Sequence, residues 1–292
     1  MNGYVGPASV GILMAEERGY FADAGLAVTV TGAAAPDAPL EYVQGHLVDF
    51  GVSQLPEIVM AREEEAEVIA VGTLVSRPTT AMIWLEKSRI EEVADLEGKT
   101  IAVPGVPFQK PFLRILLEEA GMTLEDVEVK QVGYELVQAL VSGRADAVFG
   151  GAPNLEGAAL EARGLEPVVV PVQNLGIPAY EDLVVVTRSD RMSKEPRLIH
   201  DFMSAVVRGN AAAAEDPEGA VELIEKGAET DPAAGRKATE AGVDETLPLL
   251  TRTGCMDPER ASELVAWMDE QELIREEPPV SELLTNRFAG SP

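Results

Sequence analysis

The chain has 292 residues and a formal net charge of −27, and 46% of its residues are hydrophobic. This length exceeds one ordinary core and fits two domains of common size, while the acidic balance excludes nucleic acid as a partner because phosphates need a face of Lys and Arg. No stretch approaches about 20 uninterrupted apolar residues, so the sequence predicts no membrane-spanning helix.

Short β-branched runs alternate with amphipathic stretches over the first two thirds of the chain. The expected strands are 27–30, 49–52, 68–74, 81–85, 100–103, 128–132, 145–149, 167–172 and 182–187. The expected helices between them include 10–24, 112–120, 136–141 and 154–163. Because strands and helices alternate, we expect an α/β fold whose mixed sheets are dominated by parallel pairs and are covered on both faces.

From residue 196 onward the pattern becomes helical throughout. Asp216-Pro217 and Asp257-Pro258 are typical helix starts, with Asp as the N-cap and Pro as the first helical residue. The last hundred residues are therefore predicted to form a helical C-terminal annex, not a further sheet.

Four turns after predicted strands carry glycine, proline and polar side chains. Their sequences are VSQLPEIV, AVPGVPFQKPF, VGYELVQAL and GGAPNLEG. In open parallel sheets, ligands bind beyond the carboxyl ends of the strands, where such loops meet. Asn154 and Glu156 in the last turn are therefore candidate ligand contacts, although an N-cap role for Asn154 and a helix-dipole role for Glu156 would also explain them.

Four segments in order, AEERGYFADAGLAVTV, APLEYVQGHLVDFGVS, VADLEGKTIAVPG and LVSGRADAVFGG, resemble type II periplasmic binding proteins. The branch they resemble includes the binding proteins for thiamine precursors (pyrimidines) and, more widely, receptors for nitrate, sulfonates and taurine. The resemblance implies two lobes, 1–82 plus 179–292 and 83–178, that close on a ligand like a hinge. The two crossovers between the lobes would lie near 79–82 and 177–183.

The resemblance also implies a set of ligand contacts. In the family the last turn usually reads Gly-Gly-Tyr-Trp-Asn-x-Glu, and its Glu, similar to Glu156, bonds an aminopyrimidine. Here Ala152-Pro153 replaces the aromatic pair, so another aromatic side chain or a different ligand must fill that space. The expected contacts are Tyr4, Asp37, Gln54, Phe108, Tyr134, Asn154, Glu156 and Tyr180.

The resemblance implies a solute receptor of an ABC importer for a small heteroaromatic molecule such as a thiamine pyrimidine precursor. It implies a monomer with an importer permease and its ATPase as partners. A receptor for a sulfonate or nitrate anion, an enzyme of the thiamine pyrimidine synthase type and a ligand-sensing domain are the alternatives. No Ser-His-Asp set, phosphate loop or dinucleotide fingerprint is present, and a single Cys255 with two separated histidines predicts neither a disulfide nor a metal site, so we expect no enzyme and no cofactor.

The N-terminal sequence MNGYVGPASVG has no basic segment followed by an apolar one, so it predicts no secretion signal. The resemblance nevertheless implies work outside the cytoplasmic membrane. We therefore expect the first strand, and a lipoprotein signal with it, to lie upstream of Met1.

Overall fold

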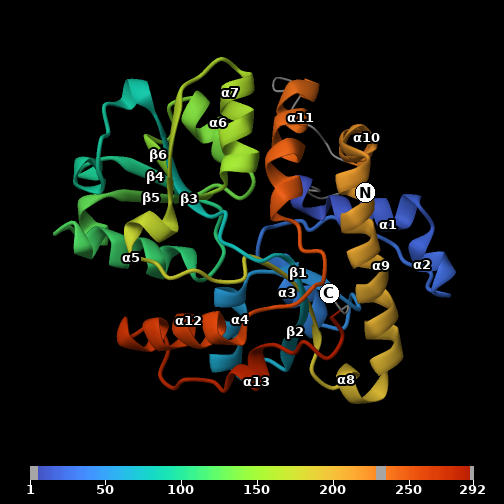
Figure 1. The fold of residues 1–292 in the computed structure, drawn as a ribbon. Helices are drawn as coiled ribbons and strands as arrows, with labels where there is room; N and C mark the ends of the chain where they lie inside the picture. Colours follow the sequence, from blue (N-terminus) through green and yellow to red (C-terminus); the bar gives the residue numbers. More distant parts are fainter. Residues whose placement is uncertain (1–5, 228–234, 290–292) are drawn as a thin grey trace.

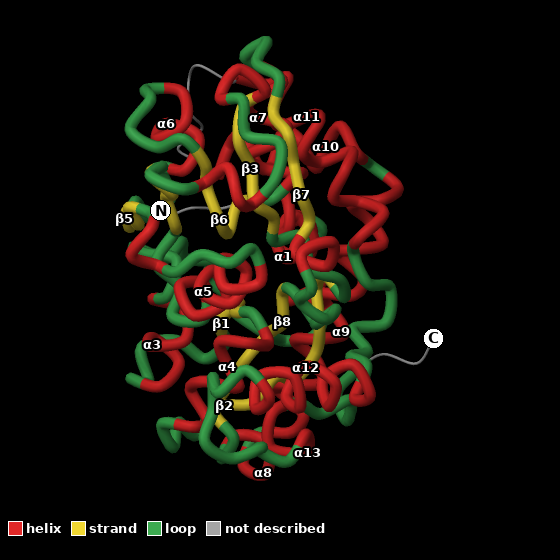
Figure 2. The backbone as a smooth tube through the Cα atoms, turned by 90° about the vertical axis from the view of Figure 1, so that its left-hand side faces the viewer, coloured by secondary structure: helices red, strands yellow, loops and turns green. Residues whose placement is uncertain are grey.

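The computed structural model describes residues 6–227 and 235–289, and its strands form two sheets (Figure 1). The first sheet has the order β1 (Gly51–Ser53), β8 (Leu183–Arg188), β2 (Val68–Val75). The second has the order β5 (Glu128–Gln131), β4 (Thr100–Val103), β6 (Ala147–Gly151), β3 (Ala81–Leu85), β7 (Pro167–Pro171). In Figure 2, β3, β6 and β7 lie above β1, β8 and β2.

The chain passes between the two sheets twice, at the places where crossovers are predicted. It leaves the first sheet after Val75 and enters the second at Ala81, and it returns between Pro171 and Leu183. The exact division into lobes at 82 and 178 stays a prediction.

The strand directions differ from the prediction. β4 is parallel to β5 and β6, but β3 is antiparallel to β6 and β7, and β8 is antiparallel to β1 and β2. Among the described strands, the first sheet is wholly antiparallel and the second is mixed. Antiparallel pairs are therefore in the majority, and the expected dominance of parallel pairs is wrong. The physical reason is that β3 and β8 arrive from the opposite sheet, so neither needs the helical crossover that links sequential parallel strands.

The helices surround both sheets (Figure 1). They are α1 (Val10–Glu17), α2 (Tyr20–Asp23), α3 (Ala38–Gln44), α4 (Leu55–Glu63), α5 (Gln109–Glu119), α6 (Leu136–Val141), α7 (Ala158–Ala162), α8 (Arg191–Lys194), α9 (Pro196–Glu215), α10 (Pro217–Gly227), α11 (Gly235–Thr246), α12 (Pro258–Glu270) and α13 (Val280–Leu283). The predicted helix 10–24 is divided because Gly19, at φ 72°, adopts the left-handed conformation that glycine tolerates. None of the described helices is both long enough and apolar enough to cross a membrane.

The predicted strand 27–30 is wrong. This segment pairs with no described strand, and its residues run as a loop. Its alternation is nevertheless used in packing, because Val28 and Val30 are partly buried against a hydrophobic cluster that contains residues of α1, α9 and β2. Alternation alone therefore identified a half-buried segment but not a partner strand.

The helical annex is confirmed, and it contacts both halves of the molecule. α9 packs along α1, and α11 packs against α7 and the π-helical turn η5 (Pro153–Gly157) that precedes it (Figure 1). Asp257 caps α12 as predicted, since its side chain accepts hydrogen bonds from the backbone N–H groups of Glu259 and Arg260 at 3.0 and 3.4 Å.

Candidate ligand-binding site

A cavity of about 910 Å³ lies between the two sheets, within the usual size range for sites that hold small molecules. Its walls come from the loops that follow β1, β4, β5 and β6, and from both crossovers. Four of the eight predicted ligand contacts border it, namely Gln54, Tyr134, Asn154 and Glu156. A cavity therefore lies at the turns where the sequence predicts ligand binding.

Three of the other predicted contacts, Asp37, Phe108 and Tyr180, do not border the cavity. Phe108 and Tyr180 are fully buried in the hydrophobic core, where their rings meet edge to face with centroids 6.5 Å apart. Their apolar rings are removed from water by packing, so we leave both out of the proposed contacts. Asp37 begins α3 and is partly buried beside the site, and Tyr4 lies outside the described residues.

Glu156 is the buried acid of the cavity wall. Its carboxyl Oε2 accepts a hydrogen bond from the backbone N–H of Ala152 at 2.7 Å, and only 8% of the residue is exposed. Burial raises the pKa of Glu156 to about 7, against the opposing effect of the Ala152 hydrogen bond. At neutral pH this carboxyl therefore exists in both forms, and it can accept a hydrogen bond or donate one.

Asn154 does not act as an N-cap, so that alternative is wrong. The N-cap position of the turn is Ala152, and the Asn154 side chain instead donates to Thr246 Oγ1 of α11 at 2.7 Å. The backbones also approach closely here, because a Cβ on Gly242 would lie 2.6 Å from the Asn154 carbonyl oxygen. Asn154 thus joins the cavity wall to the C-terminal annex.

A polar network at the crossovers forms another wall. Asp182 accepts hydrogen bonds from Gln54 Nε2 at 2.7 Å and from the backbone N–H of Thr79 at 3.1 Å. Thr80 Oγ1 lies 3.3 Å from Gln54 Nε2, and all four residues border the cavity. Burial raises the pKa of Asp182, while these hydrogen bonds oppose the shift.

Two tyrosines border the cavity. Tyr134 follows β5 and is 41% exposed, and Tyr42 lies on α3. Burial, reinforced by the charges of Asp37 and Tyr42, raises the pKa of Tyr134 to about 12. These rings are candidates for the stacking surface that the replacement at Ala152-Pro153 removes.

Sequence reasoning missed several residues of the cavity wall. They are Tyr42, Thr79, Thr80, Gln109 and Asp182. A local signal existed only for Gln109, which follows Phe108 in a turn already identified, and whose Oε1 accepts from the backbone N–H of Val106 at 3.1 Å. The others become neighbours only when the two crossovers come together.

The charge of the cavity is acidic. Among the described residues that border it, none is Lys, Arg or His, whereas Asp49, Glu156 and Asp182 are acids. Asp49 is paired with Arg191 at 2.5 Å. Among the described residues, no three His, Cys, Asp or Glu side chains gather as a metal site.

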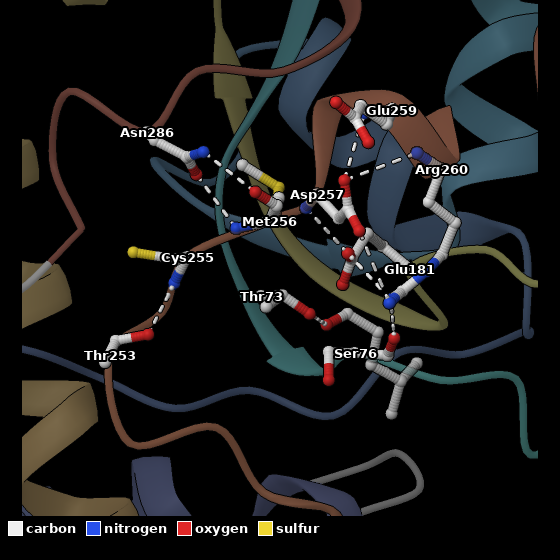
Figure 3. Close-up of polar contacts among 11 residues, drawn as sticks. Thr73, Ser76, Glu181, Thr253, Cys255, Met256, Asp257, Glu259, Arg260 and Asn286 are labelled. Carbon is white, nitrogen blue, oxygen red and sulfur yellow. Dashed lines mark hydrogen bonds and ion pairs between the residues drawn. The ribbon is translucent and has the colours of Figure 1, made fainter. Parts of the chain in front are cut away.

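A second polar cluster holds the N-terminus of α12 against both crossovers (Figure 3). Glu181 Oε1 accepts from the backbone N–H of Asp257 at 2.9 Å and from Arg260 Nη1 at 3.2 Å. The same Arg260 nitrogen donates to the carbonyl oxygen of Ser76 in the first crossover. One arginine of the annex therefore contacts both strand-to-strand connections.

The fold is that of periplasmic binding proteins. The alkanesulfonate-binding protein SsuA from Xanthomonas axonopodis pv. citri, solved with bound MOPS, matches with a TM-score of 0.75 and 16% identity over 96% of this chain and 95% of that one. A Candida albicans protein described as having the generic periplasmic binding protein fold matches with a TM-score of 0.70 and 14% identity over 96% and 94%. These likenesses show the architecture alone.

The sequence places the chain more narrowly. It belongs to the NMT1/THI5-like family, whose model matches residues 6–220. The formylaminopyrimidine-binding protein of Halalkalibacterium halodurans is 28% identical over 279 residues, or 93% of this chain and 83% of that protein. The 4-amino-5-hydroxymethyl-2-methylpyrimidine phosphate synthase of Legionella pneumophila is 25% identical over 99% of this chain and 90% of that one. The chain is therefore similar both to a protein named for binding and to proteins named as synthases.

Proposed function

We propose that this protein is the solute receptor of an ABC importer and binds a small amino-substituted heteroaromatic compound of the pyrimidine type. The carrying observation is Glu156, a buried carboxyl with a pKa of about 7, in a cavity whose described wall holds no cationic side chain. A carboxyl in such a place suits a neutral ring that offers N–H donors and a ring nitrogen. The relative from Halalkalibacterium halodurans, named for a formylaminopyrimidine, supports the same class of ligand.

The cavity disfavours the sulfonate or nitrate alternative. A sulfonate stays anionic at every physiological pH, so burying it requires compensating positive charge or many donors. This wall instead brings three acids to the ligand, of which only Asp49 has an arginine partner. The likeness to SsuA, at 16% identity, concerns the fold and not the ligand.

The receptor proposal is preferred to the enzyme alternative because of what borders the cavity. Neither His46, His200 nor Cys255 is part of its described wall, so no imidazole or thiol borders a bound ring among the described residues. The enzyme alternative is a pyrimidine phosphate synthase, because relatives of this chain carry that name. A synthase would convert the compound it binds, whereas a receptor releases its ligand unchanged.

The proposed partners are the permease and the ATPase of the importer, with the receptor working as a monomer outside the cytoplasmic membrane. The two crossovers and the cavity between two sheets fit a hinge that closes on the ligand. A lipid anchor remains an expectation of the resemblance.

A thermal-shift comparison tests the ligand class. We expect 4-amino-5-hydroxymethyl-2-methylpyrimidine to raise the melting temperature, since a ligand at a hundredfold excess over its Kd stabilises the folded state by about 2.7 kcal/mol. MOPS and methanesulfonate serve as the anionic comparison, and mass spectrometry of the recovered ligand shows whether it is unchanged. Stabilisation by the sulfonates alone, or conversion of the pyrimidine, would refute the proposal.

The Glu156→Gln variant should bind the pyrimidine more weakly by about one to two decades in Kd. A hydrogen bond to a charged group is worth about 1.5 to 3 kcal/mol, and the amide can keep the Ala152 hydrogen bond while losing the charge and the titration. Isothermal titration calorimetry measures the change. Glu161→Gln, an exposed position on the adjoining helix, is the matched control and should bind like the wild type. Equal affinity in both variants would remove Glu156 from the ligand contacts.

A further inference from the structure

The polar network at the crossovers fixes the orientation of the Gln54 amide. Its Nε2 lies 2.7 Å from Asp182 Oδ1 and 3.3 Å from Thr80 Oγ1. Turning the amide over would place its carbonyl oxygen against the Asp182 carboxyl, which already accepts at Oδ2 from the backbone N–H and hydroxyl of Thr79. Oε1 therefore points away from this network, and no described residue donates to it. Gln54 thus carries an unused acceptor at the cavity wall.

The Thr80 hydroxyl accepts two hydrogen bonds, so its proton is left to donate to another group. Tyr180 is fully buried, and its hydroxyl donates to Thr80 Oγ1 at 2.9 Å, the one acceptor it reaches among the described residues. Thr80 Oγ1 also accepts from Gln54 Nε2, so both of its lone pairs are engaged. Its own proton has no acceptor among the described residues. Thr80, which is 4% exposed and borders the cavity, therefore holds an unused donor.

The two unused groups lie side by side on the same wall. Gln54 presents an acceptor and Thr80 presents a donor, and the two side chains are within hydrogen-bond distance of each other. A ring with an exocyclic amino group next to a ring nitrogen offers the complementary pattern, a donor beside an acceptor. The corresponding oxo compound offers the reverse pattern, because its carbonyl accepts and its ring N–H donates.

We propose that Gln54 and Thr80 determine ligand specificity by reading the amino-and-ring-nitrogen edge of the bound heterocycle. Tyr180 acts as a positioning residue, since its hydroxyl directs the Thr80 proton toward the ligand. The proposal rests on the proposed function and adds the residues that distinguish an amino ring from an oxo ring. A site built to bond an N–H strongly rejects an analogue that lacks it, because its own buried groups are then left unpaired.

The test is a selectivity ratio. Calorimetry gives the Kd of 4-amino-5-hydroxymethyl-2-methylpyrimidine and of its 4-oxo analogue for the wild type, Thr80→Val, Thr80→Ser and Gln54→Leu. We expect the wild type to prefer the amino compound by at least about a hundredfold. Thr80→Val and Gln54→Leu should each lower that ratio by about tenfold, the value of one ordinary hydrogen bond, and Thr80→Ser should restore it.

Thr73→Val is the matched control for folding. Thr73 is a buried threonine whose hydroxyl donates to the Leu183 carbonyl oxygen at 3.0 Å, but it does not border the cavity. It should lose stability as Thr80→Val does and keep the wild-type ratio. If Thr80→Val fails to fold, Gln54→Leu carries the test alone.

The failures of the two proposals are distinguishable. A wild type that binds the amino compound, with the same ratio in Thr80→Val and Gln54→Leu, overturns this inference and leaves the proposed function in place. A wild type that binds neither pyrimidine overturns the proposed function, and this inference with it.

Discussion

Replacing Arg260 with alanine is expected to lower the free energy of unfolding by about 3 to 5 kcal/mol, as in other proteins that lose one partner of a buried ion pair. Glu181 is 1% exposed and pairs with Arg260 at 3.2 Å, so the arginine is the charge that compensates it. Without Arg260, the carboxyl keeps the backbone N–H of Asp257, and α12 loses its hydrogen bond to Ser76 (Figure 3).

Chemical unfolding of three variants separates this cause from a general loss of contacts. Arg197→Ala removes a guanidinium that is 93% exposed and should cause no measurable loss. Adding Glu181→Gln to Arg260→Ala should recover part of the stability, because the unpaired charge is gone. Burial raises the pKa of Glu181, so the penalty should also be smaller at pH 5 than at pH 8. A loss in Arg260→Ala no larger than in Arg197→Ala would contradict the prediction.

The free energy of unfolding should fall as the pH rises from about 4.5 to about 7. Burial raises the pKa of Glu57 and of Glu156 from 4.5 to about 7 in the folded protein; for Glu57 the charge of Asp37 adds to this and the Ser53 hydrogen bond opposes it. Between these values the unfolded chain has released both protons while the folded protein keeps them. By linkage, the stabilisation is fully present below pH 4.5 and is lost as the pH passes through 7, on the order of 3 kcal/mol for each group.

Unfolding curves at pH 5 and pH 8 measure this dependence. The double variant Glu57→Gln/Glu156→Gln should have a flatter pH profile than the wild type and should be the more stable protein at pH 8. Glu161→Gln, with an exposed side chain, should keep the wild-type profile. A wild type that gains stability between pH 5 and pH 8, or a double variant with an unchanged profile, would be inconsistent with the two buried carboxyls.

Most of the candidate site lies where the sequence directs attention, but only part of its membership follows from the sequence. The turns after β1, β5 and β6 border the cavity and contribute Gln54, Tyr134 and Glu156. Glycine, proline and polar residues at strand ends are local signals, so the sequence predicts correctly where these turns lie. The direction in which a turn side chain points depends on tertiary packing and cannot be predicted locally. Phe108 and Tyr180 also follow strands or lie in a crossover, but they pack into the hydrophobic core.

The sequence alone predicted the positions of eight of the nine expected strands, the helical annex and the Asp257 cap. These features could be predicted because hydrophobic periodicity and helix capping depend on only a few neighbouring residues. The tertiary structure alone decided strand direction, since that depends on which sheet a strand enters. Only the tertiary structure shows that residues 27–30 pair with no described strand, and that Gln54 contacts Asp182, 128 residues away in the sequence. Contacts over such separations depend on how the two crossovers pack, which no local pattern in the chain encodes.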